Sequence, residues 1–448
     1  MTGRPVTAAA AQRTLLLLSA TRWFPVGLII GLVTLLMLER GLSVSQVGVA
    51  IATQGMVMLA LEVPTGGLAD ALGRRPVLIV AGLIAIVAAV VFVLAPSFGV
   101  FVLAWALQGI FRALDSGPLE AWYVDAAHAA DPHTPVERVL ARAGTVLGLA
   151  IAVGALGSGG LVAWAPIPGL SPLLPPFGLA IAVNVAHLVL TIVLVRETRP
   201  TALGASGGVP PGMHTAPGSR WRRVAGSMRV VPRTVVAGVG LLRTAPVLRC
   251  VVLVEVFWSV AMIAFETLNQ VRLVELVGGE ERAGVIIGPV SAVSWGLFAV
   301  GAALAGLASR WIGVAWTAAL ARVLNGTFVV LMGLAAGPVG LIAAFLAAYT
   351  LHGTAGPMHN ALLHRQASPA NRATVLSINS MVAGGSASLG LLALGPLAEH
   401  TSTALAIVVA GAFSMLGAFL YVPARRQERQ ATGRYTRSTK VSSPTHAV

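Results

Sequence analysis

Charged residues are scarce in this chain. Of its 448 residues, only 10% are Asp, Glu, Lys or Arg, whereas 56% are hydrophobic. Soluble globular proteins carry about 25% charged residues, so this chain has too little charge to cover a surface that faces water. The composition excludes an ordinary soluble protein and indicates that lipid surrounds most of the chain.

Cysteine and the usual catalytic motifs are also missing. The single cysteine, Cys250, excludes an internal disulfide and a cysteine metal cluster, and we expect it to be a small buried side chain. The sequence has no Walker-type phosphate loop, no Ser-His-Asp order and no metal-ligand spacing. We therefore expect no enzyme activity, no cofactor, no metal site and no direct use of ATP.

Acidic residues are few, at 16 against 30 Lys and Arg, which gives a net charge of +14. Such a balance in a soluble protein would suggest nucleic acid as the partner. Here the basic residues lie between long apolar runs, so orientation in the membrane and contact with anionic lipid explain them better. We expect no nucleic-acid partner.

The apolar runs are long and continuous, and they predict membrane-spanning helices. Only helices and closed barrels satisfy every backbone group in lipid, and a helix needs about 20 residues to cross. Runs of this length are Thr14–Leu38, Val44–Ala69, Pro76–Leu94, Phe98–Tyr123, Leu140–Trp164, Phe177–Val195, Val247–Val274, Ala283–Ala308, Val314–Leu334, Val339–Leu363, Thr374–Leu397 and Ala404–Val422. The prediction is an all-α membrane protein with about twelve transmembrane helices.

A basic segment rich in Gly, Pro and Ser separates the runs into two sets of six. We expect a first six-helix half over residues 1–195, a cytoplasmic linker over 196–246, a second half over 247–423 and a disordered basic tail over 424–448. A short amphipathic helix around Trp221–Val239 is expected within the linker.

Arginine counts predict the orientation. With the N-terminus in the cytoplasm, nearly all loop arginines face inward, and only Arg40 and Arg282 remain in the loops outside. Positive loops stay in the cytoplasm, so we expect both termini there, in a multi-pass protein of the cell membrane.

One short motif stands between the second and third runs. The residues Gly66, Gly67, Asp70, Gly73, Arg74 and Arg75 form the pattern Gly-x-x-x-Asp-x-x-Gly-Arg-Arg. Glycines at the end of a helix allow another helix to pack closely, and an acid favours the N-terminus of a neighbouring helix. Arg74 and Arg75 can bridge to acids at the end of the fourth helix, Asp125 or Glu120.

The pattern and its place after the second helix resemble the signature loop of the major facilitator superfamily. The resemblance implies two related six-helix halves, a substrate site between them and a gating role for this loop. The chain repeats the pattern as Gly306-x-x-x-Arg310-x-x-Gly313, where an arginine takes the place of the acid. We therefore expect the first copy alone to gate.

Charges within the predicted spans are costly, and each is a functional candidate. Arg112 and Asp115 lie on one face of the fourth helix and can neutralise each other, either as a permanent salt bridge or as a pair sensitive to protonation. We name Asp115 first as the residue that carries the proton, with Glu266 next and Glu62 third; a structural role for Glu62 is equally open.

The resemblance also implies that the first, fourth, seventh and tenth helices line the pathway. Polar and aromatic residues there are the candidates for the cavity and the substrate: Arg22, Trp23, Gln108, Trp122, Trp258, Asn269, Tyr349, His352 and His359. His352 and His359 are one heptad apart on one face, and an unperturbed histidine pKa of about 6.5 suits proton handling.

These features favour a monomeric, proton-coupled exporter of small amphipathic organic molecules, whose partners are the substrate, protons and the lipid bilayer. Two alternatives stay open: a proton symporter for nutrient uptake, and a membrane receptor or regulatory protein on the same scaffold. The sequence differs at two places from the drug antiporters of the family, and both differences argue against classing it as a drug antiporter. Trp105 takes the place of an arginine before Gln108-Gly109, and the glycine-rich fifth helix has no proline.

Overall fold

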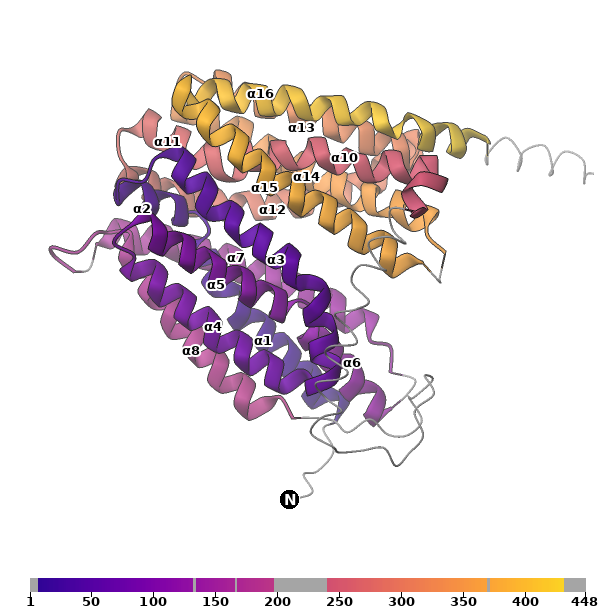
Figure 1. Ribbon diagram of the computed structural model, residues 1–448, viewed down its shortest axis with the longest axis horizontal. Coiled ribbons are helices and arrows are strands. Elements are labelled where there is room, and N and C mark those ends of the chain that lie inside the picture. Colours follow the sequence, from indigo (N-terminus) through magenta and orange to yellow (C-terminus); the bar gives the residue numbers. More distant parts are fainter. Residues whose placement is uncertain (1–6, 132–133, 166, 197–239, 369–370, 431–448) are drawn as a thin grey trace, which may run out of the picture. The chain divides into compact units, whose positions relative to one another are not determined.

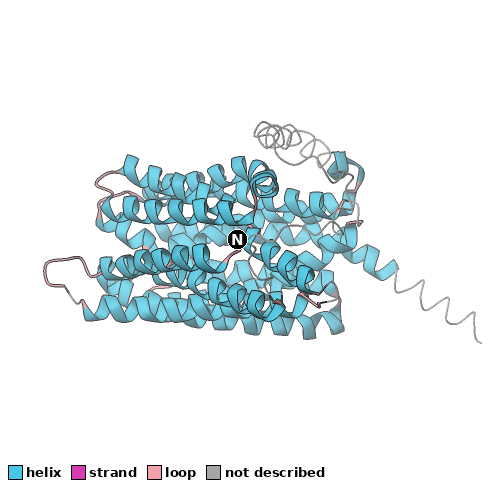
Figure 2. Ribbon diagram, turned by 90° about the horizontal axis from the view of Figure 1, so that it is seen from below, coloured by secondary structure: helices cyan, strands magenta, loops and turns pink. Residues whose placement is uncertain are grey.

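The computed structural model describes residues 7–131, 134–165, 167–196, 240–368 and 371–430. These residues form helices joined by loops, and the described part of the chain contains no strand (Figure 2). Twelve helical segments in it are long and apolar enough to cross a membrane. The all-α fold with twelve spans is therefore confirmed.

The helices of the first six spans follow the predicted runs closely (Figure 1). They are α1 (Ala8–Ile29) with α2 (Val33–Glu39), α3 (Val44–Leu72), α4 (Arg74–Leu94), α5 (Phe98–Asp115) with α6 (Pro118–Ala130), α7 (Glu137–Trp164) and α8 (Leu174–Leu194).

The remaining spans contain α10 (Pro246–Ile263) with the π-helix η1 (Ala264–Leu268) and α11 (Asn269–Val277), α12 (Glu280–Ile312), α13 (Val314–Leu334), α14 (Pro338–Gln366), α15 (Arg372–His400), and α16 (Thr403–Leu416) with the 3-10 helix η2 (Gly417–Tyr421).

The fourth predicted run, Phe98–Tyr123, was expected to be one continuous helix, but it forms two helices. It breaks at Ser116 and Gly117, where Gly117 has a φ of +93° that favours glycine. Gln108 lies on α5 before the break and Trp122 on α6 after it. Gln108 and Trp122 therefore do not share one continuous helix face, because a change in backbone direction ends the 3.6-residue periodicity.

The chain divides into two compact units. The first contains residues Met1–Arg233 and Leu273–Trp295, and the second contains Thr234–Arg272 and Gly296–Val448. Helix α12 contributes its first part to one unit and its second part to the other. This grouping assigns residues 273–295 to the first unit, whereas the sequence alone suggested one cut in the central linker.

Glycines allow α1 and α7 of the first unit to pack closely together. A Cβ placed on Gly27 of α1 would lie 2.2 Å from the Ile151 carbonyl oxygen of α7, and one on Gly154 of α7 would lie 2.4 Å from the Phe24 oxygen of α1. The two backbones therefore touch where side chains would otherwise separate them. Arg22 lies on the same helix, five residues before Gly27.

The predicted disordered tail is wrong for its first part. Residues 422–430 are helical and continue the last span, because Arg425 and Glu428 bind the ends of α12 and α13. Residues 431–448, residues 197–239 of the linker and the helix expected near Trp221–Val239 lie outside the described residues.

Candidate functional site

The predicted gating segment is mostly helix rather than loop. Helix α3 continues to Leu72 and α4 begins at Arg74, so Gly73 alone joins them, with a φ of +98°. Arg74 Nη2 lies 3.2 Å from Asp125 Oδ2 on α6, as predicted, and Arg75 Nη2 donates to the Ile192 carbonyl on α8 at 2.8 Å. Both arginines therefore bind α4 to neighbouring helices of the first unit. The side chains of Glu62, Gly66, Gly67 and Asp70 lie outside what the structure describes.

The second copy of the motif has the same backbone. Gly313 alone joins α12 to α13, with a φ of +85° and a ψ of 162° against +98° and 159° for Gly73. The repeated glycine spacing in the sequence thus corresponds to a repeated local conformation. A residue other than glycine would be strained at both positions.

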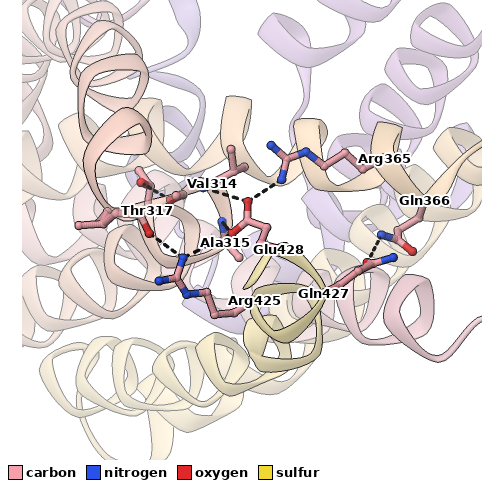
Figure 3. Close-up of polar contacts among 10 residues, drawn as sticks. Val314, Ala315, Thr317, Arg365, Gln366, Arg425, Gln427 and Glu428 are labelled. Carbon is pink, nitrogen blue, oxygen red and sulfur yellow. Dashed lines mark hydrogen bonds and ion pairs between the residues drawn. The ribbon is translucent and has the colours of Figure 1, made fainter. Parts of the chain in front are cut away.

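A carboxylate from far along the chain binds the second copy (Figure 3). Glu428 accepts hydrogen bonds from the backbone N–H groups of Val314 and Ala315, each at 3.2 Å, and pairs with Arg365 Nη1 at 2.5 Å. The first N–H groups of a helix have no partner within it and carry partial positive charge. Glu428 therefore caps α13, although the motif itself has Arg310 where an acid was expected.

A buried ion pair joins α1 to the end of α5. Arg22 Nε donates to Asp115 Oδ2 at 2.5 Å, and the two side chains are 9% and 17% exposed. The Arg22 guanidinium also lies over the rings of Trp23 and Phe111, 4.9 and 4.5 Å from their centroids. The sequence predicted Arg112 as the partner of Asp115, and the structure instead places Arg22, 93 residues away, against it.

Arg22 also lines a cavity of about 80 Å³ within the first unit. The cavity is lined by residues of α1, α2, α4, α5 and α8, and α4 packs against both α5 and α8 (Figure 1). Gln108 lines it as well, so two of the predicted cavity residues meet at one space. Its other walls are largely aliphatic and aromatic.

The second unit holds a buried polar network around Glu255 of α10. Glu255 Oε1 lies 3.0 Å from His359 Nε2 on α14, and Asn379 Oδ1 on α15 lies 3.1 Å from the same nitrogen. Both neighbours of Nε2 are oxygen acceptors, so Nε2 carries a proton in this arrangement. His359 Nδ1 meets the Tyr421 hydroxyl at 2.8 Å. That hydroxyl can donate to a neutral ring or accept from a charged one, so the network accommodates both protonation states.

Arg322 of α13 is the cation of this network. Its Nη2 lies 3.8 Å from Glu255 Oε1, and its guanidinium lies over the Trp258 ring at 3.9 Å. Its side chain is 4% exposed, and its Nε and Nη1 have no hydrogen-bond partner among the described residues. A buried guanidinium with unused donors is costly, so Arg322 offers two donors that a ligand or water can satisfy.

The two predicted histidines reach this network through different contacts. His352 stacks on Trp258, with ring centroids 4.7 Å apart, and lies 5.8 Å from the Tyr349 ring. His359 instead contacts Glu255 directly. The prediction that both residues lie on one face of the tenth span is consistent with these contacts, since both approach α10.

The remaining candidates are more dispersed. Glu266 lies in η1 and is exposed, and Gln270 Nε2 donates to its backbone carbonyl at 3.0 Å. Asn269 is 3% exposed at the start of α11. Trp122 is 1% exposed, packs in the core of the first unit and donates its indole N–H to the Arg196 carbonyl at 2.8 Å. Trp122 therefore packs in the core and does not line the cavity that Arg22 and Gln108 share, whereas Glu266 is exposed.

Sequence reasoning did not select Arg322, Asn379 or Tyr421. Arg322 interrupts the apolar run Val314–Leu334, so the rule that marks charges within a span could have found it. Asn379 and Tyr421 carry no such signal, because their importance depends on contact with His359 across more than 19 residues of chain.

The comparisons with known proteins agree with this fold. The sequence profile of the Major Facilitator Superfamily matches residues 15–348. No curated protein matches the sequence. Among solved structures, the nucleoside transporter NupG is similar with a TM-score of 0.71 at 11% identity, covering 92% of this chain and 98% of that one.

Two other structures are similar over the same extent. A POT family transporter in complex with a thioalcohol conjugated peptide has a TM-score of 0.68 at 13% identity, covering 93% of this chain and 96% of that chain. The human organic anion transporter MFSD10 (TETRAN) has a TM-score of 0.56 at 16% identity, covering 92% and 99%. At these identities the similarity concerns the fold.

Proposed function

The chain belongs to the major facilitator superfamily, and we propose that it is a secondary active transporter that exports small amphipathic organic compounds in exchange for protons. Each transport cycle exposes a substrate site to one side of the membrane and then to the other. Protons that return down their gradient supply the free energy. The solved transporters of similar fold carry small molecules according to their titles, which supports a small-molecule substrate here.

The observation that carries this proposal is the ion pair between Arg22 and Asp115. Both residues lie in membrane-spanning segments, where a charge costs about 2.5–3.5 kcal/mol on insertion scales. Arg22 lines the cavity, so the pair is adjacent to a space that a ligand can occupy. An acid whose partner borders a ligand space is suited to couple a proton to that ligand.

Everted membrane vesicles test the direction and the driving force together. Vesicles with an acidic interior should accumulate a labelled amphipathic compound, chosen by comparing compound release from cells with and without the protein. Dissipation of the pH gradient should abolish the accumulation. An uptake symporter would instead accumulate compound in right-side-out vesicles with acid outside, and a receptor would show no gradient-driven movement in either preparation.

We expect Asp70→Asn to impair transport, whereas Arg310→Ala has little effect. Asp70 is the acid of the first motif copy, and the second copy has an arginine at that position. If Asp70 stabilises one conformation by about 1–3 kcal/mol, its removal shifts the conformational balance roughly 5- to 150-fold. Initial rates in vesicles, normalised to the protein in the membrane, measure both variants. Equal effects of the two changes would contradict a gating role for the first copy alone.

We also expect both termini and the central linker to lie in the cytoplasm. In a Cys250→Ala background, Ser206→Cys should react with membrane-permeant thiol reagents and resist impermeant ones applied to whole cells. Labelling of that position by the impermeant reagent would overturn the orientation derived from arginine counts.

A further inference from the structure

The cavity of the first unit has two polar groups that the protein itself does not satisfy. Gln108 of α5 and Asn184 of α8 line it, and neither side chain forms a hydrogen bond with another described residue. Each amide offers two donors and two acceptor lone pairs. Both side chains are half-buried, so their amides are accessible from the cavity and can pair with a polar ligand group placed between them.

Charge at the cavity is already balanced. Arg22 is the one charged residue among the described residues that line it, and its guanidinium is paired with Asp115. A carboxylate ligand would compete with Asp115 for Arg22 and leave one carboxylate unpaired in a buried site. A cationic ligand would add a second positive charge beside Arg22. Both arrangements leave a buried charge without a partner, which costs several kcal/mol.

Aromatic side chains also line the cavity. Phe92 and Phe177 stack with ring centroids 5.5 Å apart, and Trp105 meets Phe92 edge-on at 5.9 Å. The volume of about 80 Å³ is well above the roughly 10–15 Å³ that one water molecule needs. The space therefore fits a small molecule, or the polar end of a larger one, with one polar and one apolar side.

From these observations we infer that the cavity lined by α1, α2, α4, α5 and α8 binds a small uncharged amphipathic group, such as a carboxamide, through Gln108 and Asn184, with its apolar side against Phe92, Trp105 and Phe177. This inference names a substrate class for the proposed transporter and therefore rests on the proposed function. The amides of Gln108 and Asn184 pair with the polar part of the ligand, and the aromatic rings cover its hydrocarbon part. The Arg22–Asp115 ion pair disfavours charged analogues.

Binding to the purified full-length protein, followed by ¹⁹F NMR with no membrane gradient, tests the inference separately from transport. Trifluoroacetamide and trifluoroacetate share one apolar group and differ in charge. The wild type should show saturable binding of the amide and at least tenfold weaker binding of the carboxylate. Gln108→Leu and Asn184→Leu preserve approximate side-chain size and should each weaken amide binding roughly 2- to 12-fold, as expected for loss of a neutral hydrogen bond.

Asn360→Leu, at an exposed asparagine on α14 in the second unit, serves as the control and should leave binding unchanged. The inference is overturned if the wild type binds neither probe saturably, which would mean that the cavity holds water alone. It is also overturned if trifluoroacetate binds at least as tightly as the amide, or if both leucine variants bind like the wild type. A vesicle assay that shows no export, beside intact amide binding, would refute the proposed function and leave this site standing.

Discussion

Asp115→Asn is expected to abolish proton-driven accumulation while downhill exchange of substrate continues. Moving one charge across about 100 mV is worth about 2.3 kcal/mol, so one proton per cycle can support roughly 50-fold accumulation. An asparagine cannot carry that proton. Its amide has nearly the shape of the carboxyl group and leaves the helix geometry unchanged. Accumulation in vesicles with and without a pH gradient, and exchange at equal pH, measure the two activities separately.

A loss of stability must be separated from a loss of coupling in this variant. Removing Asp115 leaves the buried Arg22 unpaired, and breaking such a pair costs about 3–5 kcal/mol. The double variant Arg22→Gln/Asp115→Asn restores the charge balance and should recover protein in the membrane without recovering proton-driven accumulation. Glu120→Gln, which changes an exposed acid on α6, is the matched control and should accumulate substrate normally.

Full proton-driven accumulation by Asp115→Asn would reduce the Arg22–Asp115 pair to a structural salt bridge. Glu266 would then become the leading candidate. The buried Glu255–His359 contact in the second unit would be tested beside it, because it also joins a buried acid to an ionisable side chain on another helix.

Gly154→Val should clearly lower the stability of the folded protein. A Cβ at Gly154 would lie 2.4 Å from the Phe24 carbonyl oxygen and 3.0 Å from the Leu28 amide nitrogen, so it meets backbone that cannot rotate away. Overpacking against side chains costs about 1–3 kcal/mol, and contact with backbone falls at or above the upper part of that range. We expect a destabilisation of at least roughly 2 kcal/mol, about thirtyfold in the folded-to-unfolded ratio.

Gly160→Val on the same helix is the control for this change. Gly160 is exposed, and a Cβ there would meet no heavy atom within 4 Å. Both substitutions replace glycine by the same residue within α7, so intrinsic helix propensity changes equally. Size-exclusion profiles and thermal unfolding in detergent compare the two variants. Equal stability of the two would show that α1 and α7 do not depend on the close backbone contact at Gly154.

The sequence by itself determined that lipid surrounds most of the chain, how many helices span it, and the repeated backbone conformation at Gly73 and Gly313. Apolar runs of about 20 residues leave no alternative to helices in lipid, so the twelve spans could be predicted within a few residues at most ends. The glycine spacing around Gly73 and Gly313 likewise predicted a repeat, since only glycine readily adopts the positive φ that both positions have. For Arg74 the sequence left two possible partners, Asp125 and Glu120, and the structure shows Asp125.

Only the tertiary structure decided which charges meet. Periodicity along one helix favoured Arg112 for Asp115, but the structure places Arg22 of α1 against it. The acid that caps the second motif copy is Glu428, more than 100 residues beyond it, and Glu255 finds His359 and Arg322 on two other helices. A sequence pattern records the neighbours of a residue within its own helix, whereas a buried charge takes its partner from any helix that packing brings near. Helix packing in lipid depends on shape and on small residues such as Gly27 and Gly154. These small residues decide which helices meet, and nothing in the sequence around a charged residue records that choice.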